Sequence, residues 1–229
     1  MTLFLFDLDG TLLRTDGVGR RAVARALTVH FGRVLPFDEI SFSGRTDPAI
    51  FRAILRASGV PDDETDAALP DLLRHFEAEM IETITPARVT ALDGAADLVH
   101  ALAARADVAL GLVTGNVEAT AYAKLRAIGL DAPFAHGAFG SDHEIRDHLP
   151  PIAIERAEAH TRRRFAPDTV VVVGDTEHDV ACARTSGLRA VAVATGHFDR
   201  AHLEAHAPDV VLDDLRDAAA FIAATLPPR

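Results

Sequence analysis

Short apolar runs recur along this chain, and amphipathic helical segments separate most of them. The four valines at 170–173 show no polar alternation, as expected of a strand buried on both faces of a parallel sheet. Strands that alternate with helices in this way predict an α/β fold, a doubly wound parallel sheet with a Rossmann-like core. Strands are expected within residues 2–7, 108–116, 134–140, 169–175, 189–196 and 209–215, and helices within 94–106, 116–130 and 177–188. Gly129 and Gly187 stand where helix C-caps are expected.

One region of the chain has only helical patterns. Residues 17–32, 47–59 and 66–84 each show the spacing of an amphipathic helix, with no convincing strand between them. Because this region interrupts the chain after its first strand, we expect an all-helical cap domain inserted into the core. The expected cap spans residues 16–86, and the α/β core spans residues 1–15 and 87–229.

The charge and the cysteine content exclude several classes of protein. A net charge of −11 argues against a general nucleic-acid or anionic-membrane surface, so an anionic substrate needs local positive charge. No apolar run approaches the length of a membrane span, and the first residues do not resemble a secretory signal. The single cysteine, Cys182, excludes an internal disulfide and a multi-cysteine zinc site. We expect a cytoplasmic protein, either a monomer or a homodimer.

Acidic and hydroxyl-bearing residues follow three of the expected strands. Asp7 and Asp9 come after the first, a Thr-Gly-Asn turn at 114–116 after the second, and Asp175 and Asp179 after the strand that contains the four valines. In open α/β sheets, ligands bind beyond the carboxyl ends of the strands, so these groups would converge on one crevice. Several carboxylates in one crevice require a cation, and oxygen ligands of this kind suit Mg²⁺.

These motifs, in this order, resemble those of the haloacid dehalogenase superfamily, and the resemblance covers essentially the whole chain. The stretch DLDGT matches the nucleophile motif, TGN the second motif and GDTEHD the acidic motif, while the helical insertion resembles a C1-type cap. The resemblance implies phosphoryl transfer through a covalent aspartyl-phosphate, in which Asp7 is the nucleophile and Asp9 the general acid and base. It also implies these further roles: phosphate binding by Thr114, Gly115 and Asn116, and Mg²⁺ binding by Asp7, Asp9, Asp175 and Asp179.

One motif departs from the family pattern. The family normally places a lysine between the third and fourth strands, where it bridges the nucleophile and the phosphate. The only lysine here is Lys124, on the helix after the TGN motif, and we predict that Arg146 takes the bridging role instead. The alternative for Arg146 is a solvated surface arginine, and the alternative for Asp179 is a helix cap.

The expected cap contains one loop that could reach substrate. In the stretch SFSGRTDPAI, Asp47 is interpreted as an N-cap, followed by Pro48 at the first helical position. Arg45 and Thr46 would then project toward the crevice, and Arg45 would recognise a carboxylate or a second anionic group of the substrate. The alternative for Arg45 is a charge on the cap surface.

The expected function is that of a Mg²⁺-dependent phosphatase, a phosphoric monoester hydrolase that acts on a small phosphomonoester and is similar to the phosphoglycolate phosphatases. The presence of Asp9 argues against dehalogenation, in which no leaving oxygen needs a proton. The absence of lysine from the expected cap excludes the Schiff-base route of phosphonate hydrolysis. Two alternatives stay open: a phosphomutase of the beta-phosphoglucomutase kind, and a non-catalytic binding or regulatory protein on the same scaffold.

Overall fold

A computed structural model of the chain describes residues 1–226, and it has a parallel sheet at its centre. The sheet has six strands in the order β5-β4-β1-β6-β7-β8, and every neighbouring pair is parallel. The predicted α/β fold is therefore confirmed. The strands are β1 (Thr2–Phe6), β4 (Val108–Val113), β5 (Gly137–Ala138), β6 (Val170–Gly174), β7 (Arg189–Val193) and β8 (Val210–Leu212). The fifth expected strand is correct in place but short, since only two residues of 134–140 pair with β4.

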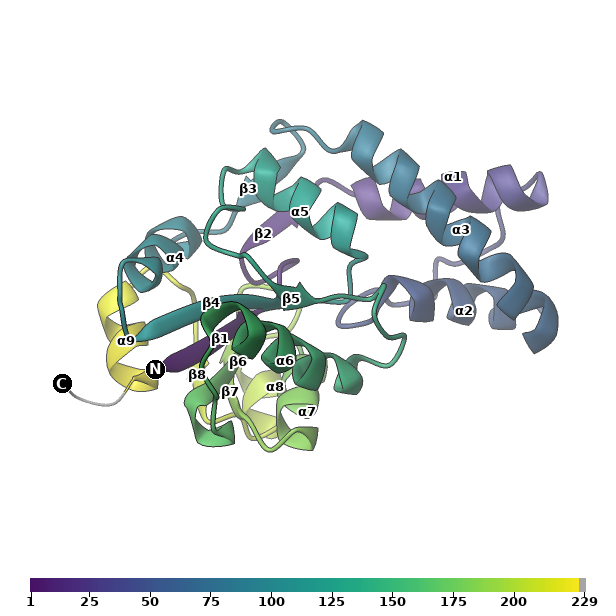
Figure 1. Cartoon of the computed structure of the whole chain (residues 1–229). Coiled ribbons are helices and arrows are strands. Elements are labelled where there is room, and N and C mark those ends of the chain that lie inside the picture. Colours follow the sequence, from purple (N-terminus) through teal and green to yellow (C-terminus); the bar gives the residue numbers. More distant parts are fainter. Residues whose placement is uncertain (227–229) are drawn as a thin grey trace.

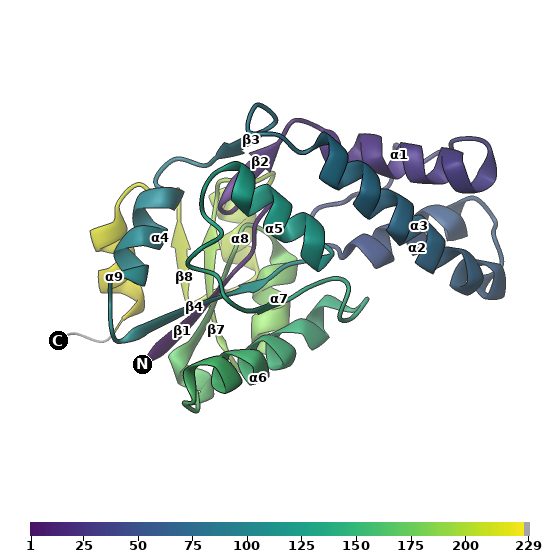
Figure 2. The same ribbon diagram turned by 45° about the horizontal axis from the view of Figure 1, so that its top comes forward.

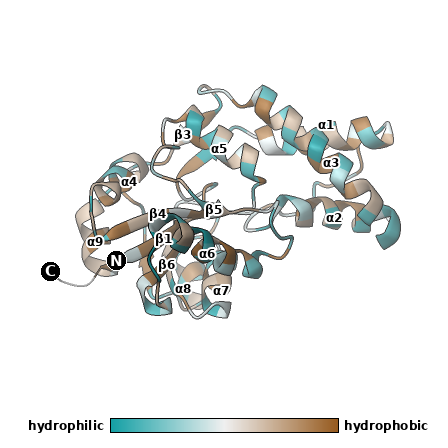
Figure 3. Cartoon of the chain, viewed as in Figure 1, coloured by the Kyte–Doolittle hydropathy of each residue, from teal (hydrophilic) through white to brown (hydrophobic). Residues whose placement is uncertain are grey.

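Side chains alternate along β1 and thereby supply two separate hydrophobic cores. Phe4 and Phe6 point to one face of the sheet and pack with residues of the helices at 95–103, 118–127 and 218–225. Leu3 and Leu5 point to the other face and pack with residues of the helices at 149–161, 177–185 and 200–205. Figure 1 shows these helices on opposite sides of the sheet, and Figure 3 shows hydrophobic residues along its strands. All five residues of β1 are buried, which explains why four of them, Leu3 to Phe6, are apolar.

The helices of the core connect the parallel strands. They are α4 (Ala95–Ala103), α5 (Glu118–Ala127), α6 (Leu149–Thr161), α7 (Glu177–Thr185), α8 (Arg200–Ala205) and α9 (Ala218–Thr225), with two 3-10 turns, η1 (Arg146–His148) and η2 (Pro167–Thr169). Gly129 and Gly187 follow α5 and α7 with φ angles of 70° and 68°, the left-handed conformation that ends a helix. Within residues 1–226, no helix combines the length and apolar character needed to cross a membrane.

Three helices form a separate layer beyond the carboxyl edge of the sheet. They are α1 (Val18–Phe31), α2 (Asp47–Ala57) and α3 (Asp62–Thr83), and they share a third hydrophobic cluster, in which the rings of Phe51 and Phe76 meet edge to face at 5.7 Å. Figures 1 and 2 show this layer at the opposite end of the molecule from the N-terminus. The two connections to it run side by side as the antiparallel strands β2 (Leu13–Thr15) and β3 (Val89–Ala91). The sequence did not predict this pair, because three residues are too few to show a strand period.

The chain order reverses at β1, and this topology decides where a ligand can bind. The strand β4 lies on one side of β1 and β6 lies on the other, so the loops after the three strands diverge to opposite sides and leave a crevice at their carboxyl ends. The helical layer α1–α3 covers this same edge (Figure 2). The residues that follow β1, β4 and β6 therefore face the helical layer.

Candidate active site

A cavity of about 970 Å³ lies where the helical layer meets the carboxyl ends of the strands. Residues from both parts of the molecule line it. The lining from the sheet side includes Asp7, Asp9, Thr114, Gly115, Asn116 and Asp175, and the lining from the helical side includes Arg20, Arg45 and Asp47. Most of the residues that the sequence predicted for the site are thus in contact with one cavity.

Asp7 is the first residue after β1, and it is buried. Its backbone N–H donates to the carbonyl of Val173 in β6 at 2.9 Å, which fixes the carboxylate at the end of the sheet. Burial raises the pKa of Asp7 to about 6, although the positive charge of Arg146 opposes this rise. Its side chain is 9% exposed, which leaves it access to the cavity while most of its surroundings are protein.

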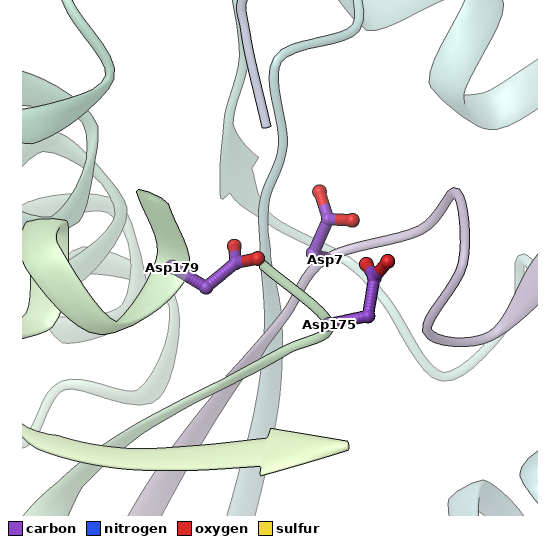
Figure 4. A group of neighbouring side chains, drawn as sticks. All are labelled: Asp7, Asp175 and Asp179. Atoms are coloured by element: carbon purple, nitrogen blue, oxygen red, sulfur yellow. The ribbon is translucent and has the colours of Figure 1, made fainter. Parts of the chain in front are cut away.

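Asp7, Asp175 and Asp179 form an acidic cluster, with one oxygen of each lying within 4.8 Å of the others. Figure 4 shows the three carboxyl groups close together, that of Asp179 on a helix and those of Asp7 and Asp175 on segments outside helices. Asp175 accepts a hydrogen bond from the Thr11 hydroxyl at 3.1 Å, and burial, followed by the negative charge of Asp7, raises its pKa well above the ordinary value. Three buried carboxylates with one arginine beside them can bind a metal ion.

Two glycines enclose the Asp175 carboxylate. A Cβ on Gly10 would lie 2.3 Å from Asp175 Oδ2, and a Cβ on Gly196 would lie 1.7 Å from the same atom. No side chain fits at either position while the carboxylate keeps its place. The backbone at these two glycines therefore packs closely against the carboxylate and restricts its position.

Asp179 already has partners for both of its oxygens. Its Oδ2 accepts from the backbone N–H and the hydroxyl of Thr176 at 3.0 and 2.7 Å, which makes a capping box at the start of α7. Its Oδ1 accepts from Arg146 at 2.5 Å. The helix-capping alternative is thus present in the structure, with Thr176 as the N-cap, and it coexists with membership of the acidic cluster.

Arg146 lies in η1 and is buried against the acidic cluster. Its Nη2 donates to Asp7 at 2.9 Å and to Asp179 at 2.5 Å, and its Nη1 donates to the carbonyl of Gly44 at 3.3 Å. Burial by itself lowers the pKa of Arg146, but the charges of Asp179 and Asp7 outweigh burial and raise that pKa above its ordinary value. The alternative of a solvated surface arginine does not describe a side chain that is 7% exposed.

A second polar cluster surrounds Asp9, and the sequence did not predict all of it. Asp9 Oδ2 accepts from Asn116 Nδ2 at 2.8 Å and from Lys124 Nζ at 2.6 Å. Asn116 Nδ2 also donates to the hydroxyl oxygen of Thr114 at 2.8 Å. The sequence predicts that Lys124 does not bridge the nucleophile and the phosphate, and it predicts no other role for it, but the structure places Lys124 on α5 within the site. Two features of the sequence could have pointed to Lys124: it is the only lysine, and it comes about two helical turns after Asn116.

The start of α2 differs from the sequence prediction. Thr46, not Asp47, is the N-cap, because its hydroxyl accepts from the backbone N–H of Ala49 at 3.2 Å, and Pro48 is the second helical residue. Thr46 is also buried and donates to the carbonyl of Glu144 at 2.6 Å, so it does not project into the crevice as expected. Arg45 is exposed and lines the cavity.

The carboxylate of Asp47 does not cap α2 and instead accepts a hydrogen bond from the core of the molecule. Asp47 Oδ2 accepts from the backbone N–H of Val117 at 2.8 Å, and its own N–H donates to the carbonyl of Gly115 at 2.8 Å. Burial raises the pKa of Asp47 to about 7, against the lowering effects of the Lys124 charge and the hydrogen bond from Val117. Asp47 is a second site residue that the sequence did not reveal, since its partner lies 70 residues away.

The loop before α2 rests directly on the residues that follow β4. A Cβ on Gly115 would lie 2.0 Å from the carbonyl oxygen of Arg45, so only glycine permits this approach. A Cβ on Gly44, whose φ is +69°, would lie 2.4 Å from the ring of His178. The loop before α2 is therefore in close contact with the core at two points.

The fold and the site together define an α/β protein with a buried acidic centre beneath a helical layer. The model of the haloacid dehalogenase-like hydrolase family matches residues 4–193. The chain is 30% identical over 220 residues to a phosphoglycolate phosphatase of Synechococcus elongatus, with 95% of each chain covered. It is 27% identical over 217 residues to a pyrophosphatase PpaX of Bacillus mycoides, with 93% of each chain covered.

The solved structures agree with this result at the level of the fold. A crystal structure described as a predicted phosphoglycolate phosphatase from Haemophilus somnus superimposes with a TM-score of 0.72 at 19% identity, covering 96% of this chain and 97% of the other. The chain therefore belongs to the haloacid dehalogenase-like hydrolases. The expectation of a phosphoric monoester hydrolase of this family is confirmed.

Proposed function

We propose that the protein is a Mg²⁺-dependent phosphatase that hydrolyses a small phosphomonoester through an aspartyl-phosphate on Asp7. The observation that carries the proposal is the separation of the two leading carboxylates into different environments. Asp7 adjoins Arg146 and the acidic cluster, whereas Asp9 is held by Asn116 and Lys124. Two carboxylates with different partners are suited to two different roles, nucleophile and general acid.

The acidic cluster has the composition of a Mg²⁺ site. Asp7 and Asp175 would supply carboxylate oxygens, Asp9 its main-chain carbonyl, and Asp179 a contact through water, because both of its oxygens have partners. Hard oxygen donors with room for water favour Mg²⁺ over softer metals. When bound, Mg²⁺ would supply positive charge to the phosphoryl oxygens.

The residues of the chain carry the reaction in two steps. An oxygen of Asp7 attacks phosphorus, the bond from phosphorus to the leaving oxygen breaks, and Asp9 gives its proton to that oxygen. Asp9 then takes a proton from water, whose oxygen attacks phosphorus and breaks the bond to Asp7. Phosphate leaves, and both carboxylates return to their starting states.

Several groups are placed to hold the transferring phosphoryl group. Arg146 offers a guanidinium next to the nucleophile, in the role that a lysine fills elsewhere in the family. The Thr114 hydroxyl oxygen accepts from Asn116, so its own O–H can donate to a phosphoryl oxygen. The backbone N–H of Gly115 is a further donor in the same turn. These donors would stabilise the negative charge of the transition state.

The cap is proposed to select the substrate. Residues 16–86 would form the cap, and residues 1–15 and 87–229 the core, with the substrate enclosed between them and water excluded. Arg45 is proposed to bind a carboxylate or second anionic group, which suits a substrate of the phosphoglycolate kind. A pyrophosphate substrate would use the same arginine, and relatives named as pyrophosphatases make it the second candidate.

Phosphate release from a panel of small phosphate compounds tests this proposal. The panel contains 2-phosphoglycolate, hexose phosphates and pyrophosphate, each with Mg²⁺ or with EDTA, and Asp7→Asn serves as the inactive control. Metal-dependent release that is lost in Asp7→Asn supports the proposal. Isomerisation of a sugar phosphate without release would indicate a mutase, and the absence of turnover in folded protein would indicate a binding protein.

A further inference from the structure

The most unusual charge in the site is the ammonium group of Lys124. It is the only lysine among 23 basic residues, and its side chain is 6% exposed. A buried ammonium is costly unless it is fully paired. The hydrogen-bond partners of the Lys124 ammonium therefore indicate its role in the site.

Lys124 has two close partners within the cavity wall. Its Nζ donates to Asp9 Oδ2 at 2.6 Å and to Asn116 Oδ1 at 2.5 Å. Asn116 in turn donates to the same oxygen of Asp9 at 2.8 Å. One oxygen of Asp9 is thus held from two directions. In the part of the chain that the structure describes, no hydrogen bond to the other oxygen, Oδ1, is found.

We infer that Lys124 is a positioning residue that orients Asp9 so that Oδ1 faces the leaving oxygen of the substrate. This inference rests on the proposed function, in which Asp9 transfers a proton to that oxygen. A carboxylate that is free to rotate would present either oxygen in many directions, whereas a carboxylate clamped at Oδ2 presents Oδ1 in one. Productive proton transfer requires such a fixed geometry.

The same lysine also orients a second group. Because Asn116 Oδ1 accepts from Lys124, the amide nitrogen must face the other way, toward Asp9 and Thr114. The Thr114 hydroxyl then accepts from that nitrogen and keeps its proton for the phosphoryl group. Lys124 is well suited to this place because its ammonium is compact, whereas an arginine would require more space and a planar arrangement of partners.

A loss of acid positioning has a specific kinetic signature. An alkyl phosphate such as 2-phosphoglycolate has a basic leaving oxygen that needs a proton, whereas 4-nitrophenyl phosphate loses a stable anion that needs little help. Misplacing Asp9 should therefore slow the first chemical step, which kcat/KM reports, much more for the first substrate than for the second. Hydrolysis of the phosphoryl group on Asp7 is the same step for both substrates and does not enter kcat/KM. A merely structural defect would slow both substrates alike.

The test compares Lys124→Met with Arg126→Met in the full-length enzyme, with Asp9→Asn as reference. Arg126 is exposed on the same helix, so its variant removes the same charge away from the site. For Lys124→Met we expect kcat/KM on 2-phosphoglycolate to fall on the order of 10- to 100-fold, since general acids contribute roughly 10²–10⁴-fold, with less than about threefold change in kcat/KM on 4-nitrophenyl phosphate. Arg126→Met should match the wild type in kcat/KM on both substrates.

Equal losses of kcat/KM on the two substrates, or wild-type kinetics in Lys124→Met, would overturn the inference. If Lys124→Met does not fold, Lys124→Gln provides the same comparison with a shorter polar side chain. If the wild type itself releases no phosphate from either substrate, the proposed function fails. An active wild type with equal losses in the variant removes only the positioning role, so the two failures are distinguishable.

Discussion

Replacing Arg146 by methionine removes the positive charge that lies between two buried carboxylates. Arg146 donates to Asp7 at 2.9 Å and to Asp179 at 2.5 Å, and the side chains of these acids are 9% and 3% exposed. Removing one partner of a buried ion pair costs about 3–5 kcal/mol, because the other charge stays buried and unpaired. In a chain of this size each kcal/mol corresponds to roughly 2–4 °C, so the melting temperature should fall by about 6–20 °C.

Thermal unfolding in EDTA at about pH 8 measures this loss, because at lower pH the carboxyl groups can escape the penalty by binding protons. Arg146→Lys is the matched control, since it keeps a positive charge and should lose less stability. Mg²⁺ should restore part of the stability of Arg146→Met, since a cation in the acidic cluster replaces some of the missing charge. A melting temperature within about 2 °C of the wild type in EDTA would refute the reasoning.

Two further variants test other parts of the structure. Gly115→Ala places a Cβ 2.0 Å from the Arg45 carbonyl oxygen and pushes the helical layer outward, so kcat/KM should fall by up to roughly 100-fold. A Gly115→Ala variant with wild-type kcat/KM would contradict the close docking. Burial lowers the pKa of His136 to about 4 in the folded protein, whereas the same histidine keeps its ordinary pKa of 6.5 in the unfolded chain. As the pH falls below 6.5, the unfolded chain therefore binds a proton that the folded protein does not, and the free energy of unfolding decreases. The wild type should lose about 2–3 kcal/mol of its free energy of unfolding between pH 7 and about pH 4.5 through this histidine, and His136→Phe should not show that loss in urea unfolding. The same pH dependence in wild type and variant would exclude His136 as the cause.

The sequence predicted the parts of the fold that depend on local patterns. The buried strand β1 and the valine-rich strand β6 were recognisable because both of their faces are apolar. The ends of these strands then located Asp7 and Asp175 in one crevice, since parallel strands bring their carboxyl ends to one edge. The arginine at 146 was found by its place in the chain, and the structure puts it against Asp7.

The parts that the sequence did not predict depend on contacts between distant residues. Asp47 and Lys124 look like ordinary helix residues, and only the folded chain brings them to Val117 and Asp9. The exchange of roles between Thr46 and Asp47 has the same origin, because either side chain can cap a helix and the contact with the core decides between them.

The most direct test of the account is to look for the phosphoryl group on the enzyme itself. Wild type and the variants Asp7→Asn and Asp9→Asn are mixed with Mg²⁺ and 4-nitrophenyl phosphate, whose leaving oxygen needs little help from Asp9, and the reactions are quenched in acid and digested. The peptide that contains residue 7 is then examined by mass spectrometry. The account predicts a phosphoryl group on Asp7 that accumulates in Asp9→Asn, because water is no longer activated, and that is absent from Asp7→Asn. Phosphate release by Asp7→Asn at the wild-type rate, with no phosphoryl group on any peptide, would contradict it.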